Sequence, residues 1–159
     1  MVRIRPATPT DIPAILHFIR SLADYEKLLD SVVADEAKLT ATLFGVRPYA
    51  EVLIASWNDT PAGFALFFNN YSTFLAKPGI YLEDLFVDPE FRGRGVGKAL
   101  LVHLAKLTVE RACGRLEWSV LDWNESAIGF YKSLGAAPLD EWTIFRVTGD
   151  ALTRLSQSK

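Results

Sequence analysis

Apolar residues recur with two different spacings in the first part of the chain. Residues 2–5 alternate between apolar and charged side chains, which predicts a short strand. After the capping residues 8–11, the apolar side chains follow one helix face, and they are Ile12, Ile15, Leu16, Ile19 and Leu22. A weaker helical pattern covers 36–44 and ends at Gly45 and Pro48. The pattern therefore predicts a strand followed by two helices.

The middle of the chain favours strands. Residues 52–57 and 62–68 are rich in apolar side chains and are joined by a turn-forming linker, which suits a hairpin. A loop is expected over 69–80. Residues 81–87 then form an aromatic and aliphatic run that Asp88-Pro89 closes, because proline cannot continue an internal ladder. Four antiparallel strands followed by a helix predict an α+β fold.

A glycine-rich loop joins the strand over 81–87 to that helix. The loop reads Arg92-Gly93-Arg94-Gly95-Val96-Gly97-Lys98, and the helix is predicted from Leu100, Leu101, Leu104, Leu107 and Val109. The first turn of a helix leaves N–H groups without partners and carries partial positive charge. Glycines remove the Cβ atoms that would keep a ligand from these donors, and the basic side chains add charge. The loop is therefore predicted to bind an anion.

Particular residues of this loop exclude two nucleotide-binding motifs. A dinucleotide fingerprint needs Gly or Ala at the sixth position counted from Gly93, where the chain has Lys98. A Walker A loop needs a glycine at the position of Arg92 and Ser or Thr at that of Ala99. A tight turn without a ligand is the alternative interpretation of the loop alone.

The last part of the chain predicts two more strands and two more helices. A strand is expected over 116–121, and Asn124 is a good cap for the helix that follows. One face of that helix carries Ala127, Ile128, Tyr131 and Leu134, and Gly135 ends it. A final strand over 142–147 and a short helix over 150–155 complete the prediction.

Composition narrows the class of protein. A chain of 159 residues with 50% hydrophobic residues predicts one domain over 1–159, and a net charge of −2 argues against nucleic-acid binding. No apolar run suits a membrane span, and the first residues lack the apolar core of a signal peptide. The single Cys113 makes a cytoplasmic enzyme the default and is itself interpreted as structural. His17 and His103 have no ligand spacing around them, so no metal is expected.

Several motifs resemble one family in their order along the chain. Arg92-x-x-Gly95-x-Gly97 resembles the pyrophosphate loop of the GNAT N-acetyltransferases, and Asn124-x-x-Ala127-x-x-x-Tyr131-Lys132-x-Leu134-Gly135-Ala136 resembles the second half of their signature. With Tyr81-Leu82-Glu83-Asp84 and Val120-Leu121-Asp122-Trp123-Asn124, nearly the whole chain is similar to the diamine branch, the spermidine/spermine and thialysine N-acetyltransferases. The resemblance implies the GNAT fold, a mixed and mostly antiparallel sheet flanked by helices. It also implies acetyl-coenzyme A as co-substrate, with no metal.

The resemblance assigns roles to individual positions. The residues implied to bind the coenzyme are Leu85, Phe86, Val87, Arg92, Gly93, Arg94, Gly95, Val96, Gly97, Lys98, Asn124, Glu125, Ser126 and Ala127. Tyr131 matches the family's proton donor, and Glu83 matches the acid that helps to deprotonate the amine. The residues implied to contact the amine are Tyr25, Glu26, Glu83 and Asp84. A further family glutamate falls near Asp140-Glu141, in a segment that is shorter here.

The chemistry of amine acetylation supports these roles. An alkylammonium with a pKa near 10.4 is rarely neutral at pH 7, which costs roughly 4–5 kcal/mol for attack on a thioester. Glu83 lies between Leu82 and Leu85 in sequence, where partial desolvation is expected to raise its pKa and make it a better base. The departing thiolate needs a proton, which the phenol of Tyr131 can supply.

Structural interpretations of the same residues stay open. Tyr131 shares a helix face with Ile128 and Leu134, as a core aromatic residue would. Glu83 could be an edge carboxylate paired with an arginine. Asp24, Tyr25, Glu26 and Asp30 could be solvated surface instead of a substrate rim.

The sequence therefore predicts direct transfer of an acetyl group from acetyl-coenzyme A to a primary amine of a small cationic molecule, a polyamine or a lysine-like amino acid. The alternatives are acetylation of a protein or peptide amine and a non-catalytic acyl-coenzyme A sensor, and the presence of both Tyr131 and Glu83 favours catalysis. By resemblance, the protein is expected to be a homodimer. Its apolar C-terminal segment, with Trp142, Ile144 and Phe145, could contribute to the interface.

Overall fold

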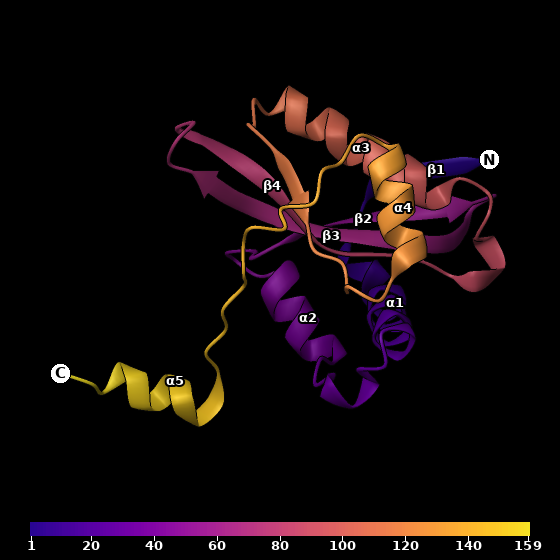
Figure 1. Cartoon of the computed structure of the whole chain (residues 1–159). Helices are drawn as coiled ribbons and strands as arrows, with labels where there is room; N and C mark the ends of the chain where they lie inside the picture. Colours follow the sequence, from indigo (N-terminus) through magenta and orange to yellow (C-terminus); the bar gives the residue numbers. More distant parts are fainter. The chain divides into compact units, whose positions relative to one another are not determined.

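In a computed structural model of the protein, which describes residues 1–159, five strands form one sheet with the order β1-β2-β3-β4-β5 (Figure 1). The strands are β1 (Val2–Pro6), β2 (Glu51–Trp57), β3 (Thr60–Ser72), β4 (Lys77–Val87) and β5 (Leu116–Trp118). Neighbouring strands are antiparallel from β1 to β4, whereas β5 lies parallel to β4. The predicted α+β fold with a mixed, mostly antiparallel sheet is confirmed.

The chain divides into two compact units, Met1–Leu121 and Asp122–Lys159. The first holds the sheet, three α-helices and three short 3₁₀ turns: α1 (Ile12–Tyr25), α2 (Glu36–Leu43), α3 (Val96–Glu110), η1 (Pro9–Asp11), η2 (Leu29–Ser31) and η3 (Pro89–Phe91). Two further helices, α4 (Glu125–Ser133) and α5 (Gly149–Ser156), belong to the second unit. The interpretation of 1–159 as a single domain stays a prediction. None of the helices combines the length and the apolar character that crossing a bilayer requires.

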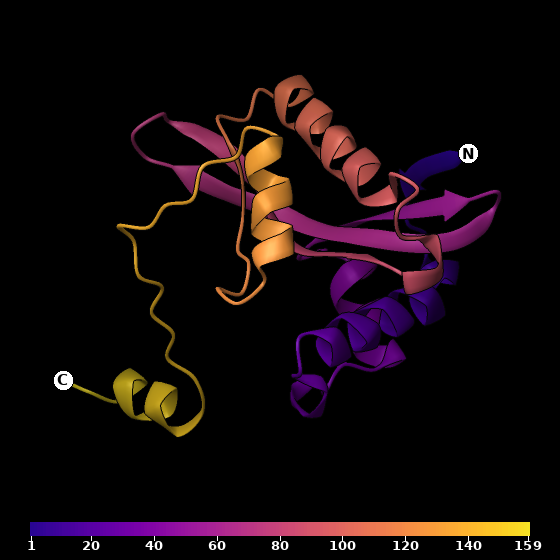
Figure 2. The same cartoon turned by 45° about the vertical axis from the view of Figure 1, so that its right-hand side comes forward.

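Helices cover both faces of the sheet in the first unit. Figures 1 and 2 show α1 and α2 on one face and α3 on the other. The predicted apolar face of α1 packs into the core, where the rings of Phe18 and Phe64 stack with centroids 5.5 Å apart. Phe86 of β4 lies in the same core, 6.4 Å from Phe18 between ring centroids. Burial of these aromatic rings fixes α1 against the middle of the sheet.

A partly buried ion pair connects β1 to the start of α1. The Nη1 and Nη2 atoms of Arg5 donate to the two carboxylate oxygens of Asp11 at 2.7 and 2.8 Å. The backbone N–H of Thr8 donates to the same carboxylate at 2.7 Å. These bonds, led by those from Arg5, lower the pKa of Asp11 to about 2. The Thr8–Asp11 capping sequence predicted for this helix therefore also secures the first strand.

The hairpin of β3 and β4 is longer than predicted. The expected loop over 69–80 is mostly ladder, because Asn69, Asn70, Tyr71 and Ser72 pair with residues 77–80. This extension runs past the core, so its side chains are largely polar or exposed and carry no clear alternation. Main-chain hydrogen bonds hold it together instead, which an apolar pattern cannot reveal.

Of two strand predictions near the C-terminus, one was confirmed in part and the other was wrong. The strand expected over 116–121 ends at Trp118, and residues 142–147 form no strand. A strand needs a partner for its backbone groups, and the second unit contains only α4 and α5 as regular elements. The apolar side chains of this segment are exposed, Trp142 by 73%, Ile144 by 76% and Phe145 by 92%. The short last helix, in contrast, was predicted correctly.

Candidate active site

Strand β4 changes its pairing in its middle. Leu66 of β3 faces Asp84 and Phe67 faces Leu82, so Glu83 is an extra residue in a β-bulge. On the other side, β5 pairs with β4 only from Ile80 to Leu82. The last part of β4 therefore has no strand partner on that edge, and its main-chain groups can bind an extended ligand. Leu85, Phe86 and Val87, predicted to present backbone groups to the pantetheine arm, lie on this edge.

The glycine-rich loop follows β4 through η3 and leads into α3. Gly93 has φ +75° and Gly95, the N-cap of α3, has φ +80°, a region that other residues rarely adopt. A Cβ on either glycine would meet nothing within 4 Å. The positive φ angles therefore explain why these positions are glycine, and a steric clash of the side chain does not. A Cβ on Gly97 would lie 3.7 Å from Val87 Cγ2, an ordinary contact. The loop thus holds the first N–H groups of α3 open to an anion.

Aromatic rings hold the two loop arginines in place. The Nε of Arg92 donates to the carbonyl oxygen of Val87 at 3.0 Å. Its Cζ lies 5.3 Å from the ring centroid of Tyr25 and 5.4 Å from that of Phe86. The Cζ of Arg94 lies 5.1 Å from the ring of Trp57, at the end of β2. Both guanidinium groups are exposed, so they add positive charge beside the helix N-terminus.

A cluster of three acidic residues lies where α1 ends against β4. Burial, together with the smaller effects of the charges of Glu83 and Glu26, raises the pKa of Asp84 to about 6. Burial also raises the pKa of Glu26, which follows α1 directly. The structure therefore brings Glu26, Glu83 and Asp84 together, with Tyr25 next to them in α1. Four residues predicted to contact the amine share one region.

One expectation about this acidic group was wrong. Partial desolvation was predicted for Glu83, but Glu83 is exposed, and burial acts on its neighbour Asp84. The bulge decides this, because the extra residue changes which side chains of β4 face inward. Glu83 forms none of the ion pairs of the structure, so the alternative of an edge carboxylate paired with an arginine is not supported.

The second signature segment lies in the other unit. The side-chain oxygen of Asn124 accepts from the backbone N–H of Ala127 at 3.3 Å and caps α4, as the sequence predicted. Glu125 and Ser126 lie in the first turn. Tyr131 lies in α4, is half-buried, and its ring centroid is 5.8 Å from that of Phe130. The proton-donor role of Tyr131 stays a prediction.

A family comparison agrees with these features. Residues 19–136 match the model of the acetyltransferase (GNAT) family. The chain belongs to this family. Members of the family use acetyl-coenzyme A as co-substrate, and the match includes both the glycine-rich loop and the segment around Tyr131.

Similar proteins act on amines. This GNAT acetyltransferase is 39% identical to the thialysine N-epsilon-acetyltransferase of Bos taurus, over 98% of this chain and 97% of that protein. It is 38% identical to the L-ornithine N5-acetyltransferase of Arabidopsis thaliana, over 98% of this chain and 88% of that protein. Among solved structures, an integron cassette protein of V. cholerae is similar with a TM-score of 0.82 and 29% identity, covering 99% of this chain and 98% of that one.

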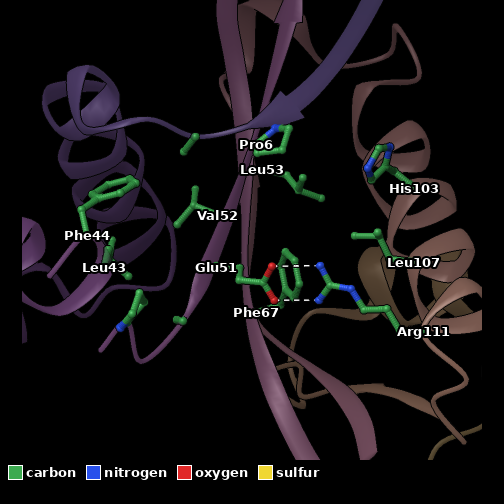
Figure 3. Close-up of a pocket in the computed structure, with 13 residues that line it drawn as sticks. Pro6, Leu43, Phe44, Glu51, Val52, Leu53, Phe67, His103, Leu107 and Arg111 are labelled. Atoms are coloured by element: carbon green, nitrogen blue, oxygen red, sulfur yellow. Dashed lines mark hydrogen bonds and ion pairs between the residues drawn. The ribbon is translucent and has the colours of Figure 1, made fainter. Parts of the chain in front are cut away.

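The acetyltransferase also has a pocket away from these residues. It has a volume of about 270 Å³ and lies where β1 ends beside β2, with walls from α2 and α3. Figure 3 shows Arg111 and Glu51 facing each other in it, joined by two hydrogen bonds of 2.7 and 2.9 Å. None of the predicted site residues lines it. The pocket therefore lies apart from the residues predicted to form the site along β4 and the loop.

Sequence reasoning missed one contact that supports the site. His17 of α1 places its Nε2 3.1 Å from a carboxylate oxygen of Asp88, which directly follows β4 and precedes η3. The two residues belong to different elements, and only tertiary packing brings them together. The position of His17 on the polar side of α1 was the available signal. The contact holds the end of β4 to α1 and so supports the entry to the loop.

Proposed function

We propose that this acetyltransferase moves an acetyl group from acetyl-coenzyme A directly to a primary amine of a small cationic molecule, an amino acid with a side-chain amine or a polyamine. One observation carries the proposal: a basic, glycine-rich helix entry lies at the end of β4, and an acidic group lies along the same strand. The first suits a diphosphate and the second an ammonium group. The names of the thialysine and ornithine relatives support an amino acid as acceptor.

The donor would bind along β4 and the loop. The N–H groups from Gly93 to Lys98, with Arg92 and Arg94, would hold the diphosphate. The open edge from Leu85 to Val87 would hydrogen-bond the pantetheine arm as an added strand would. This extended binding would direct the acetyl group toward the bulge in β4. The residues Asn124, Glu125, Ser126 and Ala127 are assigned to the coenzyme through the family signature alone.

The acceptor would bind at the acidic group. Glu26 and Asp84 would attract the ammonium form of the amine, and Tyr25 would line the site beside them. Glu83, exposed at the bulge, would take the amine proton directly or through water. The raised pKa of Asp84, about 6, makes it a second candidate for that proton, because it is ionised yet more basic than an ordinary carboxylate at pH 7.

The leaving group requires an acid. Attack by the neutral amine forms a C–N bond to the acetyl carbon, and collapse of the adduct breaks the C–S bond. The departing sulfur would receive its proton from the Tyr131 phenol. A backbone N–H of β4 would stabilise the negative charge that develops on the carbonyl oxygen. No covalent intermediate with the protein is needed.

A panel of amines tests the proposal. Purified protein would be incubated with acetyl-coenzyme A and ornithine, thialysine, lysine, spermidine or a lysine peptide, while release of free thiol is followed. Turnover with small cationic amines is expected. Turnover with the peptide alone would support a protein acetyltransferase, and coenzyme binding without turnover would support the sensor. Either of these two results would overturn the proposal.

We also propose a homodimer. The exposed apolar side chains of Trp142, Ile144 and Phe145 support this, because such side chains often mark an interaction surface. Pairing with a second copy would bury them.

A further inference from the structure

Arg92 lies between the glycine-rich loop proposed to bind the donor and the region proposed to bind the acceptor. That region, called the rim below, consists of Tyr25, Glu26, Glu83 and Asp84. Its Nε donates to Val87 in β4, and its guanidinium lies over the rings of both Phe86 and Tyr25. Phe86 is buried in the core, so the guanidinium packs against a ring that is held in place. Tyr25 is the last residue of α1 and precedes Glu26. One charged side chain therefore contacts both binding regions.

The positive charge of Arg92 lies beside a site that is proposed to bind a cation, where it would disfavour binding. The rim attracts an ammonium group through Glu26, Glu83 and Asp84, whose charges lie close enough together to affect one another. Arg92, next to Tyr25, opposes that attraction. The Nη groups of Arg92 make no hydrogen bond within the protein, so they can bind an anion. A diphosphate on the loop would compensate the charge of Arg92.

We propose that Arg92 makes the binding of coenzyme and amine cooperative: without the diphosphate its charge repels the cationic amine, and with the diphosphate this repulsion is removed. The inference rests on the proposed function and adds a positioning and charge-gating role for Arg92. The stack on Tyr25 would keep the guanidinium beside the rim in both states. The effect is electrostatic and reciprocal, so the amine tightens coenzyme binding by the same factor.

Calorimetry measures this coupling without turnover. Thialysine would be titrated into the protein alone and into protein saturated with coenzyme A, which has no acetyl group to transfer. We expect coenzyme A to lower the Kd of thialysine about three- to tenfold. The ratio of the Kd of thialysine without coenzyme A to its Kd with coenzyme A should decrease as the salt concentration rises, because the interacting charges are partly exposed.

Two variants distinguish the proposed effect of the Arg92 charge on amine binding from a general effect on the loop. Arg92→Met removes the charge but keeps an apolar side chain for the two rings. It should weaken coenzyme A binding, tighten thialysine binding to the free protein, and bring the ratio close to one. Arg94→Met is the matched control, because Arg94 contacts Trp57 and Phe91 and not Tyr25. It should weaken coenzyme A binding but keep the ratio. Tighter amine binding by Arg92→Met is a gain that a misfolded variant could not produce.

The outcomes separate the two hypotheses. If the wild-type protein acetylates small amines but coenzyme A leaves the Kd of thialysine unchanged, the role of Arg92 is wrong and the proposed function stands. The same holds if Arg92→Met and Arg94→Met behave alike. If the wild-type protein neither binds coenzyme A nor acetylates any amine of the panel, the proposed function fails, and the inference with it.

Discussion

The carboxylate of Glu26 lies close enough to that of Asp84 for its charge to raise the pKa of Asp84, although Glu26 follows α1 and Asp84 lies in β4. Burial is the larger cause of the shift. An acid that is held partly desolvated beside other acids destabilises the fold unless a cation joins it. Binding of the proposed cationic amine beside these acids would therefore stabilise the folded enzyme.

Asp84→Asn should stabilise the protein and impair its activity. The pKa of Asp84 is raised from 3.8 to about 6, so the unfolded chain ionises near pH 4 and the folded chain near pH 6. Wild-type stability therefore falls as pH rises through this window. The neutral variant should gain about 1–2 kcal/mol of unfolding free energy at pH 7 and nothing at pH 4.

Denaturant unfolding at the two pH values measures the change in Asp84→Asn. The KM for the amine should rise about tenfold at pH 7, while the Kd for coenzyme A changes little. Equal stability of variant and wild type at pH 7 would show that Asp84 is not desolvated.

Asp11→Asn should destabilise the junction of β1 and α1. The pKa of Asp11 is lowered to about 2, so its stabilising effect is complete above about pH 4 and is lost as pH falls through 4 to 2. The variant should lose about 1–2 kcal/mol at pH 7, and the difference from wild type should shrink toward pH 2. Asp59→Asn is the control, because its ion pair with Arg3 is exposed on both sides. Similar losses in both variants would contradict the interpretation.

Glycine substitutions in the loop should have opposite effects. Gly95→Ala places a Cβ at φ +80° and should cost about 1–2 kcal/mol of stability. Gly97 lies inside α3, where a Cβ makes only ordinary contacts, so Gly97→Ala should raise stability by about 0.5–1 kcal/mol. Thermal unfolding measures both changes. Calorimetry with coenzyme A should show the greater loss of affinity for Gly95→Ala. Destabilisation by Gly97→Ala would mean that the helix entry is packed differently.

Tyr131→Phe should slow the chemical step. Loss of the phenolic proton is expected to lower kcat by about two to four orders of magnitude, with little change in coenzyme affinity. Steady-state kinetics on the best amine of the panel, together with calorimetry, provides both values. Phe130→Leu, at a neighbouring position of α4, is the control for packing. Unchanged turnover in Tyr131→Phe would remove Tyr131 from the mechanism and favour its interpretation as a core aromatic residue.

The homodimer can be tested through the exposed segment. Light scattering after size exclusion should give about twice the chain mass of 17.7 kDa. The double variant Trp142→Ser and Phe145→Ser removes two apolar side chains that are 73% and 92% exposed, and should shift the protein toward monomer. A wild-type monomer at micromolar concentration would contradict the proposal.

The sequence alone determined the elements with strong periodicity and the family. The apolar face of α1 is visible because a helix repeats every 3.6 residues and its buried side is continuous. The loop from Arg92 to Gly97 is visible because its backbone requires glycine at particular positions, and those glycines stand in the family's order. Asn124 as a cap of α4 follows from a local rule as well.

Only the tertiary structure decided which side chains meet. The bulge at Glu83 determines that Asp84 is half-buried, and a bulge depends on the pairing with β3 rather than on any pattern within β4. The stack of Arg92 on Tyr25 requires α1 to end beside β4. The ladder over 69–80 exists because β3 continues, and the apolar residues 142–147 form no strand because pairing needs a second backbone. Local periodicity can be recognised in a single stretch of sequence, whereas the burial of a side chain and the pairing of a strand depend on elements that are distant in sequence.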